Sequence, residues 1–297
     1  MIVSASRRCD LPARRMDWLM DRLREGRVEV PNPFDARRPR LVSLDPASVD
    51  CVVFWTRDPR PLAARAAELA GMGFRFYVHV TITGYPEALE PGTLGAADAV
   101  AAFSALSDAV GPERALWRYD PILVARGLDA DWHPRNFAAL ARALEGRTRR
   151  VTLSLLDEYA RTRARLERAG LPEPVFGTRR GGPGPAEDGS GAEAPGPLFG
   201  QPPAPPAPYP ALLAGLAAIA RGRGMEPLSC AEPYDLSALG IGRGSCVDAK
   251  LIETLFGIDL PATKDRGQRP DCGCAPSVDI GEYGTCPAGC VYCYARR

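Results

Sequence analysis

The sequence predicts an α/β protein with a parallel sheet: a partial (β/α)6 TIM-like barrel followed by a C-terminal cysteine-rich, metal-binding extension. Short β-branched or aromatic runs alternate with longer helical patterns in the first half of the chain, which is typical of βα units. The uninterrupted apolar run at residues 51–55 suits a strand that is buried on both faces. The extension is predicted because seven of the nine cysteines come after residue 229.

Six strands and the helices between them follow one another along the chain. The strands are expected at residues 2–6, 51–55, 74–81, 115–119, 151–155 and 225–230. The helices are expected at residues 17–25, 61–70, 96–110, 134–144, 159–169 and 209–221. A further helix is expected at residues 247–256, and the remainder of the C-terminal region should be organised by cysteines rather than by an apolar core.

Composition divides the chain into four parts. Residues 171–210 hold 12 prolines and 8 glycines in 40 residues, which is typical of a linker or a disordered insertion. Residues 1–170 are therefore expected to hold the βα units of the barrel, and residues 211–235 its last helix and strand. Residues 236–297 form the predicted cysteine-rich iron–sulfur region.

Charge and cysteine content restrict the classes of function. The formal net charge is +1, so the charge does not support nucleic acid or an anionic membrane as a partner. The first residues lack the apolar core of a secretory signal, and no apolar stretch reaches the roughly 18 residues of a spanning helix. We therefore expect a cytoplasmic protein whose cysteines serve metals or catalysis rather than disulfides.

The last cysteines have the spacing of a cluster site. Cys286, Cys290 and Cys293 form a C-x3-C-x2-C pattern, with the aromatic Tyr292 before the third cysteine. Three thiolates can hold three irons of a [4Fe–4S] cluster and leave the fourth iron open for the amino and carboxylate groups of S-adenosylmethionine. A zinc knuckle that recruits one more thiolate is the alternative interpretation of this spacing.

Four further cysteines lie upstream, namely Cys230, Cys246, Cys272 and Cys274. Four thiolates complete a closed site, so we expect an auxiliary [4Fe–4S] cluster or a structural zinc ion there. Cys230 could instead be a small buried hydrophobe at the end of an apolar strand. The two remaining cysteines are expected to pack in the core.

Four segments carry a resemblance to a known family. They read SASRRCDLP at residues 4–12, VFWTRDP at residues 53–59, WRYDPI at residues 117–122 and CPAGCVYCYA at residues 286–295. Together they resemble the domain-of-unknown-function family 1848 (DUF1848) over nearly the whole chain, apart from the Pro/Gly-rich segment. Members of that family look like radical S-adenosylmethionine proteins whose cluster motif has moved to the C-terminus.

The resemblance implies a (β/α)6 barrel and reductive cleavage of S-adenosylmethionine to a 5′-deoxyadenosyl radical. It also implies an electron donor, such as a reductase, a ferredoxin or a flavodoxin, and leaves open which small molecule or peptide is the substrate. In the superfamily the cysteine triplet usually follows the first strand, whereas that loop here reads Arg7, Arg8, Cys9, Asp10. The C-terminal triplet must therefore fold back over the barrel mouth.

Polar residues are expected at the carboxyl ends of the strands, where active sites of parallel β/α folds form. Those predicted to be catalytic are Arg7, Asp10, His79, Arg118 and Asp120, and those predicted to bind the cofactor are Thr56, Arg57 and Tyr292. An arginine in this ring could hold the methionine carboxylate by bidentate hydrogen bonds. Arg118 and Asp120 could equally form a structural ion pair, and His79 could be a hydrogen-bonded core histidine.

Two other functions fit the same residues. A zinc-dependent hydrolase on this barrel would place zinc in the cysteine sites and use acidic residues at the strand ends to activate water. A non-catalytic iron–sulfur protein would relay electrons without cleaving any cofactor.

Overall fold

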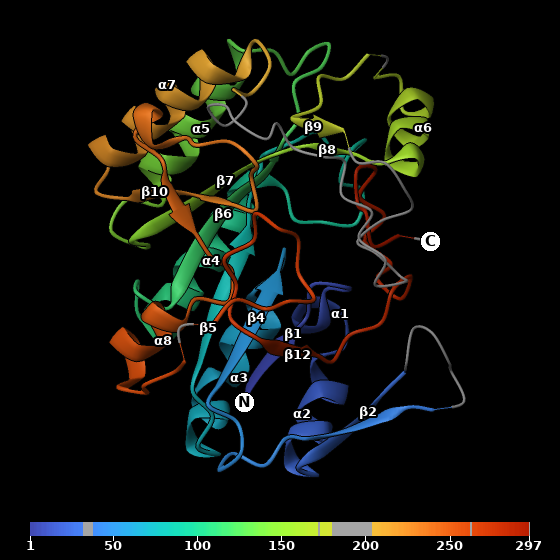
Figure 1. Ribbon diagram of the computed structural model, residues 1–297, viewed down its shortest axis with the longest axis vertical. Helices are drawn as coiled ribbons and strands as arrows, with labels where there is room; N and C mark the ends of the chain where they lie inside the picture. The colour runs from blue at the N-terminus through green and yellow to red at the C-terminus, as the bar shows by residue number, and fades with distance from the viewer. Residues whose placement is uncertain (32–37, 172, 180–203, 262, 297) are drawn as a thin grey trace.

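An eight-stranded sheet forms the centre of the computed structural model, which describes residues 1–31, 38–171, 173–179, 204–261 and 263–296 (Figure 1). The strand order is β11-β10-β7-β6-β5-β4-β1-β12, and every neighbouring pair is parallel. The strands are β1 (Ile2–Ala5), β4 (Cys51–Thr56), β5 (Phe76–Thr81), β6 (Ala115–Ile122), β7 (Arg150–Leu155), β10 (Glu226–Cys230), β11 (Gly242–Gly244) and β12 (Ser277–Asp279).

The six predicted strands are the six central strands of this sheet, side by side in chain order from β1 to β10. The predicted α/β class is therefore confirmed. The sheet has two edge strands, β11 and β12, and each comes from the region where we expected only a short helix and loops. That expectation was wrong because β12 adds beside β1 and β11 adds beside β10, so this region extends the sheet as well as carrying cysteines.

The helices fill the intervals between the strands. They are α1 (Leu11–Arg14), α2 (Met16–Arg24), α3 (Arg60–Gly71), α4 (Ala96–Val110), α5 (Trp132–Ala143), α6 (Ala160–Arg168), α7 (Tyr209–Gly222), α8 (Ala249–Phe256) and the 3-10 turn η1 (Ser237–Leu239). Two small sheets lie apart from the main one, pairing β2 (Arg27–Val30) with β3 (Arg40–Ser43) and β8 (Asp157–Glu158) with β9 (Thr178–Arg179). Residues 180–203, most of the predicted Pro/Gly-rich insertion, lie outside the described residues.

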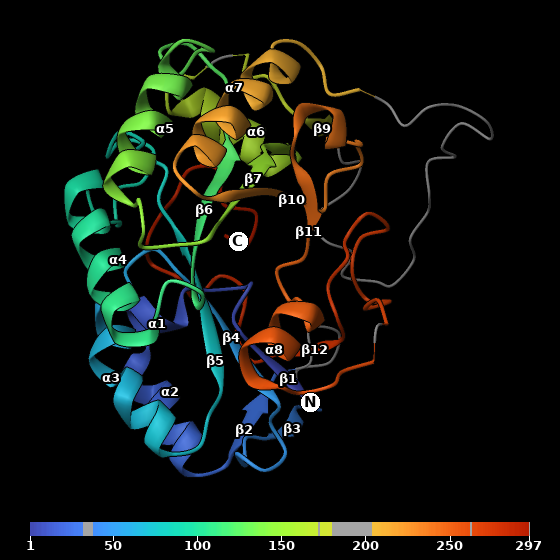
Figure 2. The same ribbon diagram turned by 90° about the vertical axis from the view of Figure 1, so that its left-hand side faces the viewer.

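Both faces of the sheet are covered, as the continuous apolar strands require. Figure 2 shows α3, α4 and α5 in a row along one face and α8 on the other. On the first face, which we call the outer face, Phe54, Phe76 and Trp117 pack with apolar residues of the helices in the larger core. On the other, inner face, Tyr77 and Leu116 pack with α8 in a second core, which also contains Cys246 and Cys274.

Local sequence explains where α8 lies. Its N-cap is Asp248, whose Oδ1 accepts a hydrogen bond from the Leu251 amide at 3.1 Å. Its end is Gly257, whose φ of 68° lies in the left-handed region that glycine adopts readily. Leu251 and Ile252 are the buried residues that attach it to the inner face.

None of the helices that the structure describes has the length and apolar character needed to cross a membrane.

Candidate metal and cofactor site

The C-terminal segment, residues 284–296, lies along the loops that follow the strands of the sheet. The Tyr294 hydroxyl donates to the Arg7 carbonyl oxygen after β1 at 2.6 Å. In the loop between β5 and α4, Gly92 N–H donates to the Ala288 carbonyl at 2.9 Å. From α6, the Arg165 guanidinium donates to the carbonyl oxygens of Val291 and Cys293, at 2.8 and 2.5 Å. These contacts hold the cysteine triplet at the carboxyl-end edge of the parallel strands.

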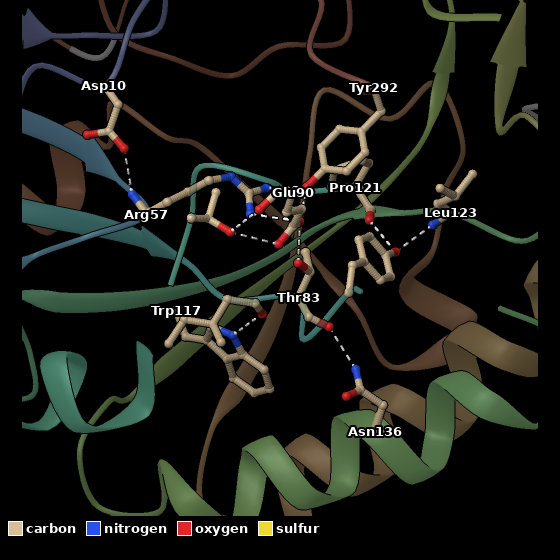
Figure 3. Close-up of polar contacts among 12 residues, drawn as sticks. Asp10, Arg57, Thr83, Glu90, Trp117, Pro121, Leu123, Asn136 and Tyr292 are labelled. Carbon is tan, nitrogen blue, oxygen red and sulfur yellow. Dashed lines mark hydrogen bonds and ion pairs between the residues drawn. The ribbon is translucent and has the colours of Figure 1, made fainter. Parts of the chain in front are cut away.

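Figure 3 shows how Tyr292 anchors this segment. Its hydroxyl donates to Glu90 Oε1, and it accepts from Arg57 Nη2 at 2.6 Å. Arg57 Nη1 pairs with Glu90 Oε1 at 2.8 Å, and the Thr83 hydroxyl donates to the same oxygen at 2.6 Å. Burial disfavours the charge on Arg57, but Glu90 and Tyr292 raise the guanidinium pKa well above its usual value. The predicted cofactor residues Arg57 and Tyr292 are therefore brought together, with the phenol turned inward to Glu90.

The three cysteines of the triplet lie close enough to interact electrostatically. Burial raises the pKa of Cys290 to about 11, while the charge on Arg57 partly opposes this rise and the neighbouring Cys293 and Cys286 add to it. Cys290 is buried, and Cys286 and Cys293 are partly exposed. Because a metal-ligating cysteine must be a thiolate, metal binding here would release protons.

The four upstream cysteines converge on the inner face. The Cys230 and Cys246 sulfur atoms lie 2.8 Å apart, and the Cys274 thiol lies close enough to Cys230, Cys246 and Cys272 to interact with all three. Hydrogen bonds from Cys230 and Cys274, together with the charge on Arg118, lower the pKa of Cys246 despite its burial. The residues that the sequence grouped as one closed site are therefore grouped in space.

The spacing of these sulfur atoms is not that of ligands around an ion. A tetrahedral site with metal–sulfur bonds of about 2.3 Å separates its sulfur atoms by about 3.8 Å, so the Cys230–Cys246 pair at 2.8 Å would have to open. Among the described residues, no group of three or more histidine, cysteine or acidic side chains has the arrangement of a metal site. The donor set nevertheless fits zinc or iron–sulfur ligation in its chemistry, because four thiols converge and two of them, Cys246 and Cys272, have a lowered pKa.

Two predicted catalytic residues, Arg118 and His79, contact the four-cysteine group. Arg118 is 7 % exposed, donates from Nη1 to the Cys246 sulfur at 2.8 Å and forms an ion pair with Asp120 through Nη2. His79 Nε2 lies 2.8 Å from the Cys246 carbonyl oxygen, so this nitrogen carries the proton. Burial lowers the pKa of His79 to about 4, which keeps the imidazole neutral.

The remaining predicted residues at the strand ends make local contacts. Asp10 Oδ1 caps α1 by accepting from the Ala13 amide at 3.0 Å, and its Oδ2 accepts from the Arg57 amide at 2.8 Å. Thr56 Oγ1 donates to the Asp58 carbonyl oxygen at 3.0 Å. Arg7 donates its backbone N–H to Asp279 Oδ2 at 2.8 Å and its Nη2 to Ser277 at 3.0 Å. Asp10 and Thr56 thus shape the loops, and Arg7 connects β1 to β12.

Sequence reasoning missed two acidic residues that organise this edge. Glu90 is 5 % exposed and accepts three side-chain donors at Oε1, and Asp279 accepts the hydroxyls of Ser4 and Ser6, each at 2.7 Å. Neither residue belongs to a motif, and several of their partners are distant in the chain, such as Tyr292 for Glu90 and Ser4 for Asp279. Glu232, which follows β10, accepts from the Leu155 amide at 2.8 Å, and burial raises its pKa to about 7.

A small cavity adjoins the Tyr292 anchor. Its volume is about 10 Å³, and Arg57, Thr81, Thr83 and Glu90 are among its lining residues. That volume accommodates about one water molecule, whereas pockets for organic ligands are of roughly 300 Å³ or more. This cavity is therefore too small for a substrate.

Comparison with known proteins identifies one family. The model of the family described as "Domain of unknown function (DUF1848)" matches residues 2–295. No curated protein and no solved structure matches the chain.

Proposed function

The chain belongs to the DUF1848 family, and we propose that it is a radical S-adenosylmethionine-type iron–sulfur enzyme on a partial β/α barrel. One observation carries the proposal: Cys286, Cys290 and Cys293 are held at the carboxyl-end edge of a parallel sheet. That edge is where parallel β/α enzymes build their active sites. The position of the C-terminal motif therefore supports the proposal.

The residues of this chain would hold the cluster-bearing segment in place. Tyr292 fixes the backbone between Cys290 and Cys293 to Glu90 and Arg57, so its proposed role changes from contacting the cofactor to anchoring the motif. A [4Fe–4S] cluster held by Cys286, Cys290 and Cys293 would supply the electron that cleaves S-adenosylmethionine to methionine and a 5′-deoxyadenosyl radical. A ferredoxin, flavodoxin or reductase would return the electron.

A substrate would lie between the two cysteine groups. Arg57 interacts electrostatically with both Cys290 and Asp120, while Arg118, the ion-pair partner of Asp120, contacts Cys246. Charged side chains thus connect the two cysteine groups, and they would suit a small molecule or a peptide with polar groups. All nine cysteines are free, which supports the proposed cytoplasmic location with its reducing conditions.

The test is metal analysis and cofactor cleavage on anaerobically purified protein. We expect iron and sulfide near eight per chain, as two four-iron clusters require, and 5′-deoxyadenosine after addition of dithionite and S-adenosylmethionine. Cys290→Ala should lose cleavage and about half of the iron. The matched control is Cys51→Ala, because Cys51 is fully buried in β4, in the sheet rather than in either cysteine group.

Each alternative function has its own outcome. Zinc without iron would overturn the proposal in favour of a zinc-dependent hydrolase, and iron–sulfur clusters without 5′-deoxyadenosine would favour an electron-transfer protein. Cleavage that survives in Cys290→Ala would remove the triplet from the mechanism.

A further inference from the structure

Four arginines form a basic surface beside the C-terminal segment. Arg161, Arg165 and Arg168 have the spacing i, i+4, i+7, so they lie on one face of α6. Arg165 interacts electrostatically with the other two and with Arg296, which follows Cys293 in the chain. Arg161, Arg168 and Arg296 are exposed. We call these four arginines the α6 basic surface.

The charges of this surface are not neutralised by the part of the chain that the structure describes. Within that part, Arg161, Arg168 and Arg296 form no ion pair, and the last two donate to backbone carbonyl oxygens. By contrast, Arg163, which lies on another face of α6, pairs with Glu158. Like charges four positions apart on a helix are destabilising, so this surface costs stability unless an outside partner neutralises it.

The helix dipole explains only part of the arrangement. Arg165 and Arg168 lie in the last turn of α6, where positive charge is favourable. Arg161 lies in the first turn, where positive charge is unfavourable. Packing does not explain Arg161 either, because Arg161 is exposed while Thr162 and Leu166 are the buried residues of the helix. A contact outside the chain is therefore the better explanation for Arg161.

The α6 basic surface adjoins the cysteine triplet. Figure 1 shows α6 near the C-terminus, and the Arg165 guanidinium donates to the carbonyl oxygens of Val291 and Cys293. Cys286 and Cys293 are partly exposed. A partner that docks on α6 would therefore contact the segment that carries the triplet.

We propose that the α6 basic surface docks the electron donor of the enzyme, a small electron carrier with an acidic surface. The proposal rests on the proposed function, because that reaction consumes electrons. On contact the carrier is oxidised by one electron, the enzyme is reduced by one electron, and no covalent bond changes. Complementary charge steers such a partner and speeds its association, which suits the small interfaces of electron-transfer complexes.

Nucleic acid is the other polyanion that a basic surface could bind. Proteins that bind nucleic acid usually carry an excess of positive charge, which neutralises many phosphates. The formal net charge of this chain is only +1, so the basic character is local to α6 and the C-terminal segment. A partner with a small acidic patch fits this footprint better than a polynucleotide.

The test compares two electron sources on the anaerobically reconstituted full chain. Formation of 5′-deoxyadenosine is driven either by reduced flavodoxin or by dithionite, at low ionic strength. The α6 variant carries Arg161→Glu and Arg168→Glu, which reverse two exposed charges, and it keeps Arg165 to hold the segment. We expect its flavodoxin-driven rate to fall about tenfold, whereas its dithionite-driven rate should equal that of the wild type.

The matched control carries Arg135→Glu and Arg142→Glu, which reverse two exposed charges at the same spacing on α5. It should keep both rates. Added sodium chloride should slow the flavodoxin-driven rate of the wild type and reduce its advantage over the α6 variant, because salt screens exposed charges. Equal flavodoxin-driven rates in the α6 variant and the control overturn the proposal, as does a wild-type rate that salt leaves unchanged.

A change in the fold of the segment has its own signature. If the dithionite-driven rate of the α6 variant also falls, the single variant Arg161→Glu decides. An unaltered flavodoxin-driven rate in that variant overturns the proposal.

Failure of the proposed function is a separate result. If dithionite yields no 5′-deoxyadenosine from the wild type, that function fails, and the docking surface is tested by binding of fluorescently labelled flavodoxin to the same proteins. We expect the α6 variant to bind about tenfold more weakly than the control. Equal binding by the two overturns the docking surface. Tighter binding of a labelled RNA duplex than of flavodoxin, lost in the α6 variant, also overturns it and assigns the surface to nucleic acid.

Discussion

Glu90 is the residue on which the C-terminal segment depends most. Its Oε1 accepts from Arg57, Thr83 and Tyr292, and Tyr292 lies 202 positions away in the chain. A buried ion pair is weak evidence for added stability, but breaking one by removing a single partner costs about 3–5 kcal/mol. The hydrogen bonds to Glu90 therefore determine where the C-terminal segment packs. Removing any of these side chains should measurably lower the free energy of unfolding.

We expect Tyr292→Phe to lower the free energy of unfolding by about 1–2 kcal/mol, because a buried hydrogen bond to a charged group is lost while the ring remains. Glu90→Gln should cost more, about 3 kcal/mol, because the Arg57 charge is left unpaired in the interior. Urea unfolding measures both. Tyr294→Phe is the comparison: its hydroxyl also bonds the segment, to the Arg7 carbonyl oxygen, but Tyr294 is 40 % exposed, so we expect a smaller loss there, and an equal loss would contradict the anchor.

Both histidines are buried and neutral, which gives a pH dependence with a definite sign. Burial lowers the pKa of His133 below the usual 6.5, and its ring lies between the Tyr119 hydroxyl and the Leu123 carbonyl oxygen. Below pH 6.5 the unfolded chain binds a proton that the folded chain does not, so stability falls as the pH falls. The slope from one such group is at most about 1.4 kcal/mol per pH unit.

We expect His133→Gln to flatten this dependence between pH 6.5 and 5. The glutamine amide can still donate to the Leu123 carbonyl, so the variant should fold. Urea midpoints of wild type and variant at pH 7.5 and 5.5 make the comparison, and parallel losses in the two proteins would argue against a titrating His133.

Sequence predicts residue types and strand ends better than it predicts partners. Arg118 and Asp120 were predicted at the end of a strand, and an ion pair between them was one of the two interpretations considered. The contact between Arg118 and a thiol was not predicted. Cys246 is 128 positions away in the chain, in a loop without a recognisable sequence pattern. Glu90 gave no signal for the same reason. Contacts made only by tertiary packing have no local sequence signature.

At the scale of elements, the alternation of apolar strands and amphipathic helices was enough to predict the six central strands. The edge strands β11 and β12 were missed because each has three residues and neither shows a strand pattern. Their pairing comes from their neighbours: Ser4 on β1 bonds Asp279 on β12, and Leu228 on β10 lies in register with Gly242 on β11. A short strand at a sheet edge is specified by the sheet it joins.

The loop between β5 and α4 accepts the C-terminal segment through a glycine. A β-carbon at Gly92 would lie 2.6 Å from the Ala288 carbonyl oxygen, which is backbone and cannot simply turn away. We expect Gly92→Ala to displace the segment, to lower the free energy of unfolding by about 1–3 kcal/mol and to speed hydrogen exchange at residues 286–293. Gly95→Ala is the matched control, since nothing lies within 4 Å of its added carbon. Equal exchange in the two variants would contradict this docking.

At the scale of the molecule, the described residues form three separate apolar clusters. The largest lies mainly on the outer face, the second joins the inner face to α8 and the upstream cysteines, and the third joins the C-terminal segment to the strand-end loops. The outer face is built from local βα units, which explains why sequence periodicity predicted it. The other two clusters join distant segments, so only the cysteine spacing pointed to them.

This division predicts the result of truncating the chain after Tyr283. Leu89, Leu123 and Tyr85 would lose their cover from Tyr292 and Ala288, whereas the outer-face core contains no residue of the removed segment except a partly buried contact from Cys286. We expect far-ultraviolet circular dichroism close to wild type, new binding of a hydrophobic dye, and an unfolding free energy lower by several kcal/mol, since each large buried side chain contributes about 1.5–3 kcal/mol. Truncation after Ala295 should change none of these. If the chain truncated after Tyr283 is wholly unfolded, the removed segment is required for folding of the whole sheet. If it folds but binds no dye, the strand-end loops cover their own apolar residues without the segment.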